Sequence, residues 1–95
     1  MDAQTAPEAI DQQLFDTISE IQGMKRDSHL FPDYAMMPEV FNFLRPEYGE
    51  RFETMEADLK EGIRRLCRAK RIEWHMTVNG VLMFGVRNQS KQKAI

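Results

Sequence analysis

Few residues of this chain have both the type and the spacing that catalysis or metal binding requires. The sequence holds two histidines, His29 and His75, and one cysteine, Cys67, and their spacing matches no zinc motif. It holds no glycine-rich phosphate loop, no serine or cysteine nucleophile beside a base, and no pair of carboxylates in an apolar setting. We therefore expect a non-catalytic protein without a metal, a cofactor or a small-molecule substrate.

The chemistry that the sequence does offer is positive charge gathered in its second half. Residues 1–59 carry four bases and thirteen acids, and residues 60–95 carry nine bases and two acids, so formal charges of −9 and +7 make up the net charge of −2. Such a separation of charge is typical of a protein that binds an oppositely charged partner through one end, or of a fold in which the two sets of charges pair with each other. The nine candidate bases are Lys60, Arg64, Arg65, Arg68, Lys70, Arg71, Arg87, Lys91 and Lys93.

Two explanations compete for these bases. Acids early and bases late in a helix oppose its macrodipole, and a glutamate four residues before a base stabilises the helix, as Glu61 does for Arg65. Arg87, Lys91 and Lys93 extend the positive region beyond anything that a helix dipole requires. Together the nine bases could form a patch that binds a nucleic-acid backbone with little sequence preference.

Helical periodicity predicts the elements that must position these residues. The first helix is expected to begin with a capping box, with Thr5 at the N-cap and Glu8 at the third helical position, and to stop at Gly23. A short second helix is expected from Pro38 until Arg45-Pro46 ends it. The apolar stripe of the first helix consists of Ile10, Leu14, Ile18 and Ile21.

A third and longest helix is predicted from near Pro46 to about Lys70. Its apolar residues recur at steps of three and four and fall on one narrow face of a helical wheel. They are Tyr48, Phe52, Met55, Leu59, Ile63 and Leu66. Gly62 lies at the edge of this face, which favours the close approach of another helix.

A β-hairpin is predicted directly after the third helix, because the apolar pattern changes to alternation at Ile72. Asn79-Gly80 is typical of a two-residue type I′ turn. Such a turn would pair Met76 with Met83 and Trp74 with Gly85. Both faces of the hairpin carry apolar residues, so the alternation does not decide which face packs on the helices. The sequence therefore predicts an α+β fold of three helices followed by a C-terminal β-hairpin.

This order of elements resembles a winged helix-turn-helix domain. The resemblance is carried by Ile63-Arg64-Arg65-Leu66-Cys67-Arg68-Ala69-Lys70-Arg71-Ile72-Glu73-Trp74, followed by Asn79-Gly80, and it covers residues 7–87. Ala69 and Lys70 stand where these domains usually carry a glycine. The resemblance implies nucleic-acid binding, with the third helix in the major groove of DNA and the hairpin as a wing that contacts the backbone or the minor groove.

The leading hypothesis is a cytoplasmic regulator or accessory protein that binds duplex DNA through the basic end of the third helix, the wing and the tail. The first half of that helix is acidic, so phosphates would repel it. The alternative is a protein-interaction or dimerisation module in which Trp74, Met76 and Met83 form the anchor patch. We expect one winged-helix-like domain over residues 7–87, a flexible N-terminus at 1–6, a flexible basic tail at 88–95, and no membrane segment.

Overall fold

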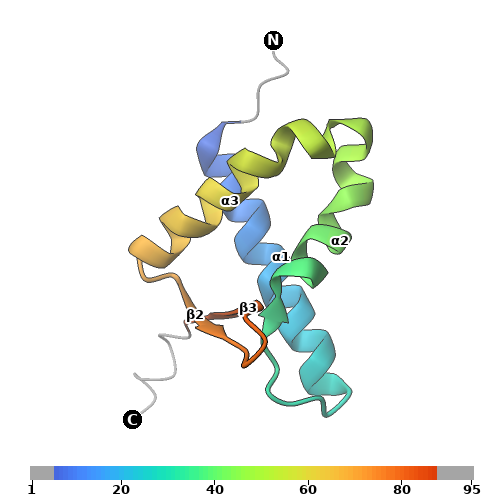
Figure 1. Cartoon of the computed structure of the whole chain (residues 1–95), viewed down its shortest axis with the longest axis vertical. Coiled ribbons are helices and arrows are strands. Elements are labelled where there is room, and N and C mark those ends of the chain that lie inside the picture. The colour runs from blue at the N-terminus through green and yellow to red at the C-terminus, as the bar shows by residue number, and fades with distance from the viewer. Residues whose placement is uncertain (1–5, 88–95) are drawn as a thin grey trace.

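The computed structural model describes residues 6–87, which form an α+β domain with a helical part and a small antiparallel sheet of three strands (Figure 1). The predicted α+β class is thus confirmed. Of the two segments expected to be flexible, only Ala6 lies within the described residues. In chain order the elements are α1 (Pro7–Asp27), β1 (Ala35–Met36), α2 (Met37–Tyr48), the 3₁₀ turn η1 (Gly49–Arg51), α3 (Phe52–Arg68), β2 (Ile72–Met76) and β3 (Leu82–Val86).

The helical part consists of two stretches, α1 and a run in which α2, η1 and α3 follow one another without a loop. The predicted break at Pro46 is wrong, because α2 continues through it to Tyr48. Val40, Leu44 and Tyr48 recur at steps of four and are all buried. The free energy gained by burying them offsets the helical hydrogen bond that is lost because proline has no backbone N–H. The run is interrupted instead at Gly49, whose φ of 56° favours glycine.

The start of α1 also differs from the prediction. Ala6 is the N-cap and has no side-chain hydrogen bond to the helix, so the expected position of the capping box is wrong. Thr5, its predicted N-cap, lies outside the described residues. Pro7 occupies the first turn, where its fixed φ suits the helix and its missing N–H costs no hydrogen bond.

The end of α1 lies one turn beyond the predicted stop at Gly23. The helix closes at His29, whose left-handed φ of 58° lets Leu30 donate its N–H back to the Lys25 carbonyl at 2.8 Å. The Lys25 ammonium also donates to the Glu39 carboxylate at 2.7 Å, which ties the last turn of α1 to the start of α2. Gly23 is an ordinary helical residue, and the ion pair between Lys25 and Glu39 stabilises the helical turn that follows it.

The end of α3 closes in the same way without a glycine. Lys70 adopts a left-handed φ of 61°, its N–H bonds to the Cys67 carbonyl at 3.0 Å, and the Arg71 N–H bonds to the Leu66 carbonyl at 3.0 Å. A residue with a Cβ pays a conformational penalty in this region. The sharp exit into β2 therefore forms despite the missing glycine, at the expense of strain at Lys70.

We expect Lys70→Gly to raise the free energy of unfolding by about 1 kcal/mol, because glycine adopts the left-handed region without that penalty. For a domain of this size the melting temperature should rise by about 4–8 °C in a thermal scan. Lys70→Ala is the matched control, since it removes the same charge and keeps the strain. An equal gain for both variants would attribute the effect to charge instead.

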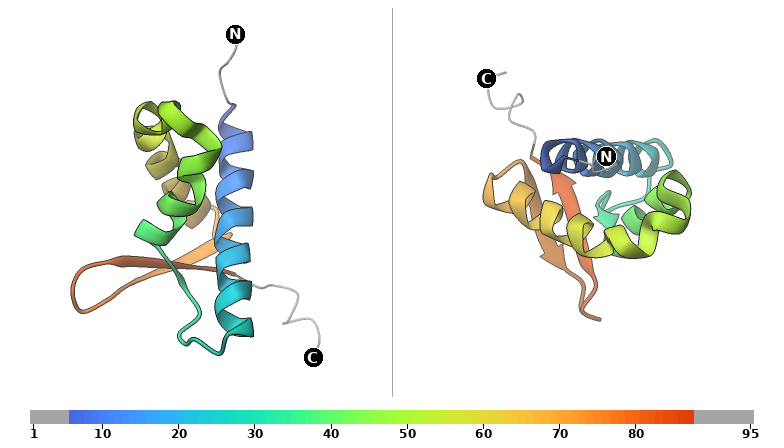
Figure 2. Two further views of the ribbon diagram at one scale, coloured as in Figure 1. Left: turned by 90° about the vertical axis from the view of Figure 1, so that its right-hand side faces the viewer. Right: turned by 90° about the horizontal axis from the view of Figure 1, so that it is seen from above.

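Figure 2 shows α1 alongside the run from α2 to α3, with the hairpin next to both. One hydrophobic core joins the helices and the sheet. The predicted stripe of α1 is buried throughout, and that of the second helical stretch is buried except for the half-buried Met55. Gly62 brings α3 close to α1, as predicted, since a Cβ there would lie 2.7 Å from Leu14 Cδ1 and 2.9 Å from Asp11 Oδ1. None of the helices in residues 6–87 is both long enough and apolar enough to cross a membrane.

The loop between β2 and β3 is longer by one residue than the predicted type I′ turn. That turn needs positive φ at both Asn79 and Gly80, and only Gly80 has it, at 85°. Gly80 donates its N–H to the Thr77 carbonyl, and Thr77 donates its own N–H to the Val81 carbonyl, both at 2.9 Å. The Thr77 hydroxyl also accepts the Val81 N–H at 3.0 Å. These bonds define a three-residue loop with glycine in its left-handed position.

The longer loop moves the strand pairing by one residue. Trp74 stands opposite Phe84, and Met76 stands opposite Leu82, so each residue of β2 faces a partner one position earlier in β3 than predicted. Side chains opposite one another share a face. The face that contains Trp74 and Phe84 packs toward α3, which decides the question that the alternation left open. Its residues are Ile72, Trp74, Met76, Leu82, Phe84 and Val86.

A third strand that the sequence analysis missed completes the sheet. β1 pairs with β3 through Ala35 opposite Phe84, so the order is β1-β3-β2 with β3 in the middle. On the other face of the sheet the Tyr34 ring lies against Gly85, where a Cβ would meet it at 2.8 Å. The same ring lies 4.9 Å from that of His75. Glycine at position 85 thus admits the aromatic ring that covers this face.

Candidate interaction site

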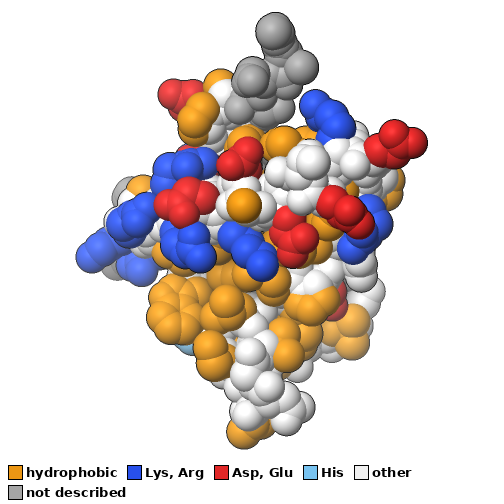
Figure 3. Space-filling model, turned by 45° about the horizontal axis from the view of Figure 1, so that its top comes forward, with side chains coloured by type: hydrophobic (Ala, Val, Ile, Leu, Met, Phe, Trp, Pro, Cys, Tyr) orange, Lys and Arg blue, Asp and Glu red, His pale blue; other side chains and the backbone are white. Residues whose placement is uncertain are grey.

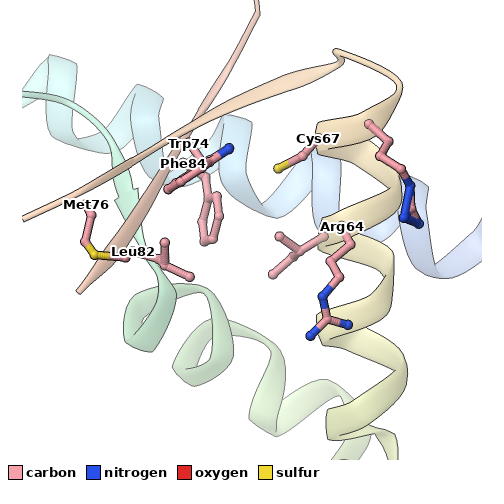
Figure 4. Close-up of a pocket in the computed structure, with 8 residues that line it drawn as sticks. Arg64, Cys67, Trp74, Met76, Leu82 and Phe84 are labelled. Atoms are coloured by element: carbon pink, nitrogen blue, oxygen red, sulfur yellow. The ribbon is translucent and has the colours of Figure 1, made fainter. Parts of the chain in front are cut away.

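A groove of about 450 Å³ lies between the last two turns of α3 and the hairpin (Figure 4). Phe84 lies at its floor and is buried, whereas Trp74 and Met76 are 55% and 54% exposed. The groove is lined by Ile63, Arg64, Cys67, Arg68, Trp74, Met76, Leu82 and Phe84. It is an apolar depression with basic side chains on one rim, and we call it the α3–hairpin groove.

The fold positions this groove through two simple periodicities. Ile63 and Cys67 are four residues apart on α3, so they lie one above the other on the same helix face. Trp74 and Met76 alternate with outward residues along β2, so they lie side by side on the sheet face that turns toward α3. The tight closure at Lys70 brings the two walls together. In Figure 3 apolar side chains form a continuous surface bordered by Lys and Arg side chains.

The structure divides the predicted apolar patch of Trp74, Met76 and Met83. Trp74 and Met76 both line the groove, but Met83 does not, because it stands opposite His75 and Met36 on the other face of the sheet. The predicted pairing of Met76 with Met83 had placed them together. Sequence reasoning missed Ile63, Cys67, Leu82 and Phe84 as groove residues, although a correct hairpin register would have found the last two.

The arginines on the rim are partly neutralised by one carboxylate. Arg64 Nη1 lies 2.7 Å from a Glu61 carboxylate oxygen, and Arg68 Nη2 lies 3.6 Å from the other. The two arginine side chains remain 62% and 65% exposed. One turn earlier, Lys60 lies 3.5 Å from Glu56. Two guanidinium groups thus share a single acid, which leaves the rim with a net positive charge.

Arg65 has a structural role. Its guanidinium binds both carboxylate oxygens of Asp11 on α1, with contacts of 2.8 and 2.9 Å, at a partly buried position. The hydrogen bond to Asp11 raises the pKa of Arg65 above its ordinary value. This pair joins α1 to α3 beside Gly62, so the Arg65 guanidinium already has a carboxylate partner within the fold. Its contact with nucleic acid stays a prediction.

A second basic surface lies at the other side of the α3 exit. Lys70, Arg71 and Arg87 surround a recess of about 290 Å³ together with Ala69 and Phe15. The Arg71 guanidinium lies 4.5 Å from the centre of the Phe15 ring, and the Arg87 N–H bonds to the Arg71 carbonyl at 3.0 Å. We call this cluster the basic corner. Lys91 and Lys93, which the sequence analysis added to it, lie outside the described residues.

Cys67 offers a chemical probe of the groove wall. Partial burial raises the pKa of its thiol above the ordinary value, so less thiolate is present at any given pH. We expect iodoacetamide to alkylate Cys67 more slowly at pH 8 than it alkylates a small free thiol, and the rate to keep rising above that pH. Mass spectrometry of timed samples measures it. A rate equal to that of the free thiol would contradict the burial.

Candidate metal ligands do not gather in the described part of the chain. Among residues 6–87, no three His, Cys, Asp or Glu side chains lie close enough together to hold a metal ion. His29 closes α1, and His75 lies between Tyr34 and Glu73, with its Nε2 3.8 Å from the Glu73 carboxylate. Comparisons of the chain with known protein families, curated proteins and solved structures find no match.

Proposed function

We propose that this protein is a non-catalytic interaction module of winged-helix-like architecture that docks a protein partner in the α3–hairpin groove. The observation that carries the proposal is the exposure of Trp74 and Met76 beside a preformed apolar depression. Tryptophan is among the residues most enriched at the energetic centres of interfaces, and methionine adapts to irregular surfaces.

The arrangement of the elements supports the winged-helix interpretation. α3 is the last helix before the hairpin, and the hairpin follows it after a tight closure, as in the domains that the sequence resembles. In this interpretation the loop at Val78–Gly80 is the tip of the wing. The proposal places the protein in the cytoplasm, where its single cysteine remains reduced.

A peptide selection tests the docking site. We expect wild-type protein to enrich a consensus from a random peptide library, and synthetic peptides of that consensus to shift the emission of Trp74, the only tryptophan of the chain. Met76→Ser should weaken their binding by about tenfold, because a buried methionine anchor contributes about 1–2 kcal/mol. Val78→Ser is the matched control at the fully exposed wing tip. Equal effects of the two substitutions would exclude the groove as the site.

Duplex DNA is a second candidate partner, favoured by the basic corner. Lys70, Arg71 and Arg87 lie together there, and none of them forms an ion pair with an acid among residues 6–87. The proposed contacts go to phosphates, so they carry little sequence preference. The bases of α3 support this candidate less, because acids of the same helix neutralise Lys60 and part of the Arg64–Arg68 charge.

A salt series tests the DNA candidate. Affinity for random duplex DNA should fall steeply with salt, and Lys70→Gln with Arg87→Gln should reduce the slope of log K against log salt by about 2, since each phosphate contact adds about 0.9. Arg51→Gln, on the exposed turn before α3, should leave the slope unchanged. Absence of binding at about 50 mM salt would remove this candidate.

A further inference from the structure

We infer that the partner segment in the α3–hairpin groove is an amphipathic helix that carries acidic side chains beside its apolar anchors. This inference rests on the proposed docking function and specifies the chemistry of the partner. It is argued from three observations. They are the shape of the groove, the sign of the charge on its rim, and the fact that a second copy of the chain would present the same concave surface.

The shape of the groove fits the apolar face of one helix. The α3 wall presents Ile63 and Cys67 one helical turn apart, a rise of about 6 Å. The hairpin wall presents Trp74 and Met76 two residues apart in a strand, about 7 Å. Phe84 closes the floor between the walls. A depression of this length accepts two large apolar side chains one turn apart, which is the spacing of i and i+4 anchors in helix-in-groove binding.

The positive charge on the rim favours a partner helix that carries acidic side chains next to its two apolar anchors. Arg64 and Arg68 lie on the same face of α3 and share Glu61 as their only acid partner among the described residues. Each guanidinium carries five N–H donors, and one shared carboxylate cannot satisfy them all. Carboxylates spaced one turn apart on a partner helix would face the two arginines in register and form charge-assisted hydrogen bonds.

Two other occupants fit less well. The chain's own segment 88–95 carries Lys91 and Lys93 and no acidic side chain, so it has the same sign of charge as the rim. A second copy of this chain that docked groove to groove would bring one concave surface against another and leave both unfilled. A convex helix with acids beside its anchors satisfies both the shape and the charge.

A pair of synthetic peptides tests the inference directly. Both contain leucines at positions i and i+4 of a helical sequence, one with glutamates and the other with lysines at the flanking positions. Trp74 emission should show that the glutamate peptide binds wild-type protein about tenfold more tightly at low salt, and that added salt narrows the difference. Arg64→Glu with Arg68→Glu should reverse the preference, while Arg51→Glu should leave it unchanged.

The possible failures separate this inference from the docking function. Equal binding of the two peptides, with both weakened by Met76→Ser, would keep the docking site and overturn the acidic partner. Library peptides that depend on Met76 but are basic or neutral would do the same. Sedimentation that shows dimers, together with Trp74 emission that changes with protein concentration, would assign the groove to a second copy. A change in that emission on deletion of residues 88–95 would assign it to the tail.

Discussion

Phe84→Ala should lower the free energy of unfolding by about 3–5 kcal/mol, the largest effect that we expect from a single substitution. Phe84 is 1% exposed on the central strand, opposite Ala35 of β1 and Trp74 of β2. Its removal would leave a cavity at the meeting point of the sheet and α3. The loss is a large part of the roughly 4–12 kcal/mol available to a domain of this size.

Urea unfolding followed by Trp74 emission measures this effect, and circular dichroism gives a signal independent of the groove. Val78→Ala is the control, because Val78 is fully exposed on the wing tip and its truncation should change stability by less than about 0.5 kcal/mol. A loss below about 1 kcal/mol for Phe84→Ala would mean that the floor of the groove is not part of the core.

Gly62→Leu should destabilise the protein by about 3 kcal/mol, although leucine forms helices better than glycine by nearly 1 kcal/mol. The added side chain would meet Leu14, Asp11 and Ile10 of α1 at distances that begin at 2.7 Å. It would therefore force α1 and α3 apart and disturb the bidentate pair between Asp11 and Arg65.

The same substitution at Gly23 is the matched control. Gly23 also lies within a helix, but a Cβ there would meet nothing within 4 Å. Gly23→Leu should therefore stabilise the protein by up to about 1 kcal/mol. Chemical denaturation of both variants measures the two changes in the free energy of unfolding, which should have opposite signs. Equal destabilisation by both would show that the loss at Gly62 does not come from the contact between α1 and α3.

The helices could be predicted from sequence because their burial follows local periodicity. The stripe from Ile10 to Ile21 and the stripe from Phe52 to Leu66 contact the core as the spacing of three and four residues requires. The helix ends were predicted less well. At His29 and Lys70 non-glycine residues adopt left-handed conformations, and at Pro46 burial of the neighbouring residues outweighs the lost hydrogen bond.

The sheet could not be predicted fully, because its strand pairing depends on residues that are far apart in the sequence. β1 is only two residues long, and it exists because Ala35 and Met36 pair with β3. The register of the hairpin was set by the loop conformation, in which Asn79 does not adopt positive φ. A shift of one residue separated Met83 from Trp74 and Met76, so the predicted apolar patch was only partly right, and the groove itself could not be predicted.

The charge pattern showed where the bases lie in the sequence but not what they contact. Arg65 is four residues from Glu61, which suggested a pair along the helix, yet it binds Asp11 on α1. Glu61 serves Arg64 and Arg68 instead. Only tertiary structure could therefore distinguish the arginine that joins two helices from those that remain available to a partner.

The central position of β3 has a consequence for the order in which the molecule is made and folds. β3 is the last element of the described chain, yet it supplies the partner of β1, and its Val86 N–H donates to Gln22 of α1 across 64 residues. A growing chain that lacks β3 leaves Ala35 without its strand partner and the core without Phe84. We therefore expect folding to wait until this strand has left the ribosome, and then to proceed as one cooperative step whose rate is set by distant contacts.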